Sequence, residues 1–100
     1  MQRIDLAYST ICYEKGVVAN WDNADNFCWD QFRTRICTLS QLRAVWCRGG
    51  VPSPGRSWTA NPAGNAAYAT ISNCSTDSMS VQPYTGQGIT GPCCIEYMRY

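Results

Sequence analysis

The clearest pattern of apolar and polar positions lies between Asn23 and Cys47. Its first half repeats apolar residues at intervals of three and four, the spacing of one helix face, at Ala24, Phe27, Cys28 and Phe32. Its second half repeats the same spacing at Leu39, Leu42, Val45 and Trp46. The pattern therefore predicts two short helices joined by a tight connection.

Residues at the ends of the two helices indicate where each begins and ends. Asp22 is the predicted N-cap of the first helix, and Asp25 is well placed in its first turn against the helix dipole. The second helix begins with a capping box, in which the Thr38 hydroxyl accepts from the backbone N–H of residue 41 and the Gln41 side chain reaches back. The paired glycines at positions 49 and 50 end it.

Segments with strand character lie on both sides of the helical region. Residues 3–12 alternate apolar and polar positions and predict an opening strand, followed by a turn at 14–16 and an extended pair at 17–18. After the helices, extended segments are predicted around Trp58 and at 66–73, 79–81 and 93–100. The loops 49–64 and 75–92 are rich in glycine and proline. This order predicts an α+β fold.

Length and cysteine content indicate one small domain, residues 1–100, held by disulfides. A chain of 100 residues buries a modest core, and seven cysteines would supplement it. The alternative is a reducing compartment, in which cysteines act as small buried apolar residues. The first ten residues contain no apolar signal-peptide region, so an exported protein would be a module of a longer chain or leave by another route.

Charge and residue types exclude several classes of function. The net charge is +1 and the basic residues are scattered, which does not suit nucleic-acid binding. No apolar run reaches the ~18 residues of a membrane span, so membrane insertion is not expected. There is no histidine and no C-x-x-C pair, which argues against zinc and against a catalytic thiol. No acid/base pair is evident, so the sequence predicts neither an enzyme nor a cofactor.

Several features together resemble a known family. A cysteine lies on the first helix (Cys28), another ends a strand (Cys74), and Cys94 opens the last strand. The second helix starts with CTLSQL, and the segment Trp58-Thr59 follows it. Their order and spacing resemble the C-type-lectin-like domain, above all its compact microbial and viral variants. The resemblance implies two short helices packed on a small, mostly antiparallel sheet with long loops.

The resemblance also implies a set of disulfides. It pairs Cys28 with Cys94 and Cys74 with Cys93, or the same bridges with Cys93 and Cys94 exchanged. Two cysteines flank the second helix and could clasp its ends, namely Cys37 and Cys47. Ten helical residues span about 15 Å, beyond the ~7 Å that a disulfide allows, so this pairing needs a shorter helix. Otherwise one of the two pairs with Cys12, which is the odd cysteine expected to be free or to bridge two chains.

The sequence departs from the family at its calcium site. Gln82-Pro83-Tyr84 lacks the carboxylate of the family's loop triplet, and Trp21-Asp22-Asn23 lies before the first helix rather than before the closing strands. Calcium needs several oxygen ligands, and the later half of the chain offers only Asp77 and Glu96. Calcium-dependent sugar binding and a metal site are therefore not expected.

The expected function is that of a non-enzymatic extracellular or surface module for recognition or adhesion, binding protein or glycan without calcium. Its ligand contacts would come from the loops, where recognition residues concentrate; the candidates are Trp58, Gln82, Tyr84 and Gln87. Asn73 begins an N-x-[ST] glycosylation pattern. The alternative is a structural subunit of a filament, fibre or virion shell, a homo-oligomer assembling through aromatic surfaces and an intermolecular disulfide.

Overall fold

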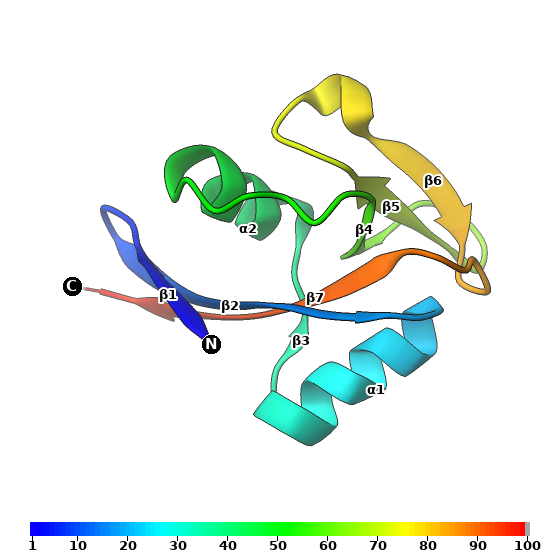
Figure 1. Ribbon diagram of the computed structural model, residues 1–100, viewed down its shortest axis with the longest axis horizontal. Coiled ribbons are helices and arrows are strands. Elements are labelled where there is room, and N and C mark those ends of the chain that lie inside the picture. The colour runs from blue at the N-terminus through cyan, green and yellow to red at the C-terminus, as the bar shows by residue number, and fades with distance from the viewer. Residues whose placement is uncertain (100) are drawn as a thin grey trace.

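The protein is an α+β fold in which two short helices pack on a mixed sheet (Figure 1). The structure, a computed structural model, describes residues 1–99. The helical elements are α1 (Trp21–Phe32), α2 (Leu39–Arg43), the π-helical turn η1 (Ala44–Arg48) and the 3-10 turn η2 (Thr76–Ser78). The strands are β1 (Gln2–Asp5), β2 (Ser9–Val18), β3 (Arg35–Ile36), β4 (Ser57–Pro62), β5 (Ala67–Ile71), β6 (Ser80–Pro83) and β7 (Thr90–Met98).

The last strand, β7, lies at the centre of the sheet. The strand order is β1-β2-β7-β4-β5-β6, and β3 also pairs with β7. All pairs are antiparallel except β4 with β7, which meet in parallel at Ser57 and Thr90. The sheet is thus mixed, and its one parallel pair joins the β1-β2-β7 half to the β4-β5-β6 half.

The two helices cover opposite faces of β2 and β7 rather than lying side by side (Figure 1). Two apolar clusters result. One gathers Leu42, Val45 and Trp46 against Ile11 and Tyr13 of β2. The other gathers buried residues from α1, β3, β4, β7 and the loop just before β7, namely Ala24, Cys28, Ile36, Trp58, Cys93 and Ile89. The short strand β3 carries the chain from one layer to the other.

Adjacent cysteines in β7 bond to opposite layers. Successive side chains of a strand point to opposite faces, so Cys93 meets Cys28 of α1 and Cys94 meets Cys37, just before α2. The expected Cys28–Cys94 bridge is therefore replaced by its exchanged form, Cys28–Cys93. The expected bridge from Cys74 to β7 is wrong, because both β7 cysteines are already paired.

The third disulfide joins Cys47, on η1, to Cys74. The clasp between Cys37 and Cys47 is wrong, because α2 and η1 form one continuous helical segment that keeps these residues apart. Cys12 has a free thiol and is half-buried on β2.

Local signals at the helix ends were partly right. The capping box of α2 is confirmed: Thr38 accepts from the backbone N–H of residue 41, and Gln41 accepts from the backbone N–H of residue 38. The expected Asp22 cap is wrong, because α1 begins two residues earlier than Asn23. Asn20 caps it instead, with its side-chain oxygen accepting from Asn23 N at 2.9 Å.

The opening segment differs from the single strand that its alternation predicts. It is a hairpin of β1 and β2, closed by a hydrogen bond from Leu6 N to Ser9 O. The predicted turn at 14–16 lies inside β2, where the pairing with β7 shifts register between Glu14 and Val17. Gly16 has φ of +74° there, and a side chain on it would lie 2.0 Å from Gly91 O, so this bulge requires glycine.

Candidate ligand groove

A groove of about 570 Å³ opens where β3 crosses between the two helical layers. It is larger than the hollows beside Pro52 and Arg48, of about 360 and 350 Å³. We call it the ligand groove; its polar and aromatic walls come from α1, β3, α2, β5 and β7, through Trp21, Asp25, Arg35, Gln41, Tyr68 and Glu96. These five elements therefore meet at one concave surface.

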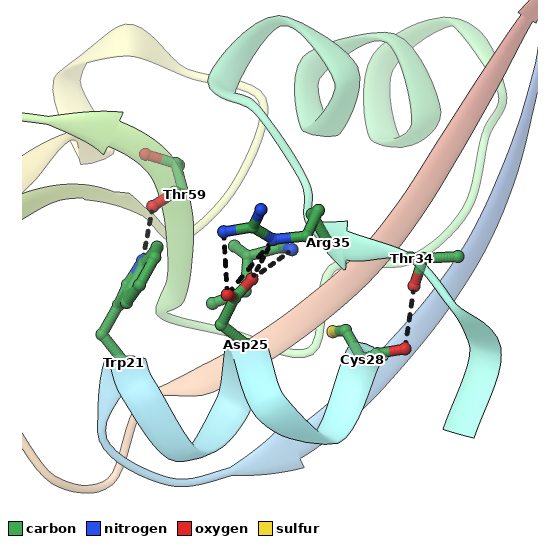
Figure 2. Close-up of polar contacts among 7 residues, drawn as sticks. Trp21, Asp25, Cys28, Thr34, Arg35 and Thr59 are labelled. Atoms are coloured by element: carbon green, nitrogen blue, oxygen red, sulfur yellow. Dashed lines mark hydrogen bonds and ion pairs between the residues drawn. The ribbon is translucent and has the colours of Figure 1, made fainter. Parts of the chain in front are cut away.

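Two stacked rings form its aromatic side. Trp21, the first residue of α1, lies parallel to Tyr68 of β5, with ring centroids 4.0 Å apart and planes within 5°. The Trp21 indole Nε1 donates to the carbonyl oxygen of Thr59 at 3.0 Å (Figure 2). The backbone N–H of Trp21 donates to Tyr84 O at 3.0 Å. Both ends of the tryptophan are thus fixed before any ligand arrives.

An ion pair stands beside the rings. Arg35 Nε donates to Asp25 Oδ1 and Oδ2 at 3.1 and 3.2 Å, and its terminal nitrogen lies 3.0 Å from Oδ2 (Figure 2). The Ile36 backbone N–H also donates to Asp25 Oδ1, at 3.2 Å. The Asp25 hydrogen bond, followed by its charge, raises the pKa of the Arg35 guanidinium above its ordinary value.

Burial separates the roles of these two side chains. The Asp25 side chain is 15% exposed and its carboxylate is engaged by β3, so it holds β3 against α1. The Arg35 side chain is 67% exposed. Two of its three nitrogens contact Asp25, and the third, Nη1, has no hydrogen-bond partner within residues 1–99. The guanidinium therefore keeps N–H groups for a ligand.

Gln41 and Glu96 also line the groove. Gln41 uses its oxygen in the α2 capping box, and its Nε2 donates to Glu96 Oε1 at 3.2 Å. Glu96 is exposed on β7, so its carboxylate retains acceptor sites toward the groove. The groove thus offers a ligand both hydrogen-bond donors and acceptors.

The four ligand-contact candidates from the sequence do not line this groove. Trp58 is fully buried and donates through Nε1 to Ala19 O at 2.9 Å, so a direct ligand contact is wrong for this residue. Gln82 pairs with Tyr68 across β5 and β6, which places the two on one face of the sheet. Tyr84 and Gln87 lie on the exposed loop before β7, where Gln87 donates to Thr85 O.

Other singled-out residues lie away from the groove. Asn73 is exposed, and its side-chain oxygen accepts from Ser75 N at 2.8 Å in a turn beside the Cys47–Cys74 disulfide. Within residues 1–99 no three acidic, cysteine or histidine side chains gather as a metal site would require. Over the same residues, no helix has the length and apolar character needed to cross a membrane.

Sequence reasoning missed the groove because its residues had local explanations. The position of Asp25 is explained by the first turn of a helix, and that of Gln41 by a capping box. Neither explanation includes the second contact of each side chain, which Asp25 makes with Arg35 and Gln41 makes with Glu96. Trp21 and Tyr68 are 47 positions apart, and no periodicity connects them. The one available signal was the charge pattern, since the basic Arg35 begins the strand that follows the helix carrying the acidic Asp25. Neither a scan against models of known protein families nor a search of curated proteins finds a match.

Proposed function

We propose that this protein is a non-enzymatic recognition module with a C-type-lectin-like fold, which binds a glycan or a protein without calcium through the ligand groove. It would act outside the cell or on a cell or virion surface. The observation that carries the proposal is the groove itself, in which fixed aromatic rings stand beside exposed charged groups.

The element order and one disulfide support the fold part of the proposal. The family to which the sequence shows a resemblance ties its first helix to its closing strand, and Cys28–Cys93 makes that link here. Both helices precede the long loops, and the closing strand β7 is central to the sheet. Three disulfides fit an oxidising environment, which suits a protein that works outside the cytosol.

The contents of the groove support recognition more than catalysis. A binding site combines an apolar wall with a few placed polar groups. Here Asp25 is occupied by Arg35 and by the backbone of β3, and Glu96 by Gln41. Both carboxylates are already bound to donors, which suits holding a ligand and does not suit shuttling a proton.

Binding assays on the folded, oxidised protein test this proposal. Immobilised glycans and immobilised extracellular proteins are probed with wild-type protein, with calcium and with a calcium chelator. We expect binding that survives chelation and that falls in the Glu96→Gln variant. Binding that requires calcium, or binding that Glu96→Gln and Tyr68→Ala both leave unchanged, would refute the assignment of the groove.

A structural subunit is the second candidate, and one surface favours it. Cys12 lies beside Ile95 in the β2–β7 register, and Tyr97 shares their face of the sheet because it is two residues from Ile95. Tyr97 is 55% exposed. In a structural subunit, this surface would pair two copies through a Cys12–Cys12 disulfide. Electrophoresis without reductant would then show a dimer that Cys12→Ala abolishes; a monomer under oxidising conditions argues against it.

A further inference from the structure

We propose that the ligand groove holds one neutral pyranose residue of a glycan, with its C–H face packed on the Trp21–Tyr68 side and its hydroxyls bonded to Arg35 and Glu96. This inference rests on the proposed recognition function and specifies its ligand. It requires no metal ion, because every polar contact comes from protein side chains.

The aromatic side suits the apolar face of a sugar ring. A pyranose carries several C–H groups on one face. The partly positive hydrogens of these groups are attracted to the negative face of an aromatic ring. Trp21 and Tyr68 are rigid, since the rings stack at 4.0 Å and the Trp21 Nε1 is bonded to Thr59 O. A rigid surface loses little side-chain entropy on binding, and this helps a small ligand.

The polar groups suit hydroxyls. Each sugar hydroxyl both donates and accepts, so it is satisfied best between a fixed donor and a fixed acceptor. Arg35 Nη1 supplies the donor, and the Glu96 carboxylate supplies the acceptor. Hydrogen bonds to charged groups are the stronger kind. The volume of about 570 Å³ falls within the usual range for small-ligand sites.

The charges of the groove disfavour an anionic ligand. The Asp25–Arg35 ion pair is neutral as a unit, so the exposed Glu96 gives these three side chains a net negative charge. An anionic ligand would be repelled by that charge, and a neutral ligand rich in hydroxyls avoids this penalty. A protein partner would need a contact of about 1,000 Å² or more, of which this concave site could supply only a part.

The test is an NMR titration of the ¹⁵N-labelled, oxidised protein in the presence of a calcium chelator. The probes are methyl glycosides of glucose, galactose, mannose and N-acetylglucosamine, with glucuronate as the charged sugar and an arginine-containing peptide as the protein arm. We expect a neutral glycoside to shift the Trp21 indole N–H and the Gln41 side-chain amide. Glucuronate and the peptide are expected to leave these signals in place.

Variants then locate the contacts. Tyr68→Ala should weaken the binding of the neutral glycoside about three- to tenfold, from the loss of aromatic packing. Glu96→Gln should weaken it by about fivefold or more, because a charged acceptor becomes neutral. The exposed Tyr97→Ala, on β7 outside the groove, is the matched control and should change nothing. If Tyr68→Ala does not fold, the exposed Glu96→Gln variant still decides the question.

The possible outcomes separate this inference from the function on which it rests. Groove shifts with a neutral glycoside, reduced by Glu96→Gln, support both. Groove shifts with the peptide or glucuronate alone overturn the neutral-sugar ligand and leave the groove as a recognition site. No shift with any neutral glycoside overturns the sugar inference. The recognition function falls only if the immobilised glycans and proteins also show no binding that depends on the groove.

Discussion

Removing the two disulfides that tie β7 to the helical layers tests how far they stabilise the fold. One variant combines Cys28→Ala with Cys93→Ala, and a second combines Cys37→Ala with Cys94→Ala, so that each lacks one bridge. A third variant carries all four substitutions and lacks both bridges. The parent protein carries Cys12→Ala, so that no free thiol can exchange with the remaining bridges.

The expected magnitudes follow from the loops that each bridge closes. The two bridges join residues that are 65 and 57 positions apart in the sequence. While one bridge remains, however, it brings the ends of the other close: Cys28 lies nine positions before Cys37, and Cys93 is next to Cys94. The ring that either bridge adds is then only about ten residues, and the chain-entropy estimate for its loss is about 2.7 kcal/mol.

Losing both bridges costs more than twice the single loss. After Cys28–Cys93 is removed, Cys37–Cys94 closes a loop of about 30 residues, because Cys47–Cys74 still shortens the path; its removal then costs about 3.7 kcal/mol. The double variant should therefore lose about 6.4 kcal/mol, against a sum of about 5.4 kcal/mol for the two single losses. The excess arises in the unfolded chain and needs no contact between the bridges.

The measurement is urea denaturation followed by tryptophan fluorescence, with no reductant. If the double variant is unfolded in buffer, a stabilising osmolyte added at equal concentration to every variant restores a folded baseline. The free energy of unfolding is then compared across parent, single and double variants. A double variant that loses clearly less than the two single losses together would refute the shared-loop reasoning.

Three further perturbations have defined outcomes. Gly91→Ala would place a methyl group 2.1 Å from the Cβ of Ala24 and push α1 away from β7, which should lower the free energy of unfolding in urea by about 1–3 kcal/mol. Adding Ala24→Gly to this variant should restore part of the lost stability. An unchanged urea midpoint in Gly91→Ala would contradict the contact. Thr38→Ala removes the cap of α2 and should cost about 1 kcal/mol, whereas Thr38→Ser should cost much less. Hydrogen bonds from Thr10 and then Arg3 hold the Asp5 pKa below its ordinary 3.8; the stability this gives is present above pH 3.8 and lost as pH falls through the folded-state pKa. Thr10→Val should therefore raise the Asp5 pKa in a carboxyl NMR titration, and an unmoved pKa would contradict the assigned cause.

Sequence reasoning predicted the elements whose signals are local. The α2 capping box needs only four consecutive residues, and the α1 stripe needs only its own apolar spacing, so both could be found without knowing the fold. The hairpin of β1 and β2 was missed because its turn, at residues 6–8, contains no glycine, proline, asparagine or aspartate. The sequence predicts a turn where β2 has the bulge at Gly16, because glycine marks both features.

The disulfide partners and the groove depended on which face each side chain occupies. Cys93 and Cys94 are consecutive in a strand, so alternation alone says that they point to opposite layers. Deciding which layer belongs to which cysteine also required knowing that α1 and α2 lie on different faces, and two adjacent helical patterns do not reveal this. The groove needed the same information for Trp21, Arg35 and Tyr68.

The consecutive cysteines of β7 also have a consequence for how the chain matures. A shift of β7 by one residue would send each of its side chains to the other face, so the thiol meant for α1 would meet the segment before α2. The two native bridges can form together only when β7 is in its native alignment with β2 and β3. Oxidation of this pair would thus fix β7 in its native alignment. A disulfide isomer with exchanged partners would indicate a chain that was oxidised before β7 had reached that alignment.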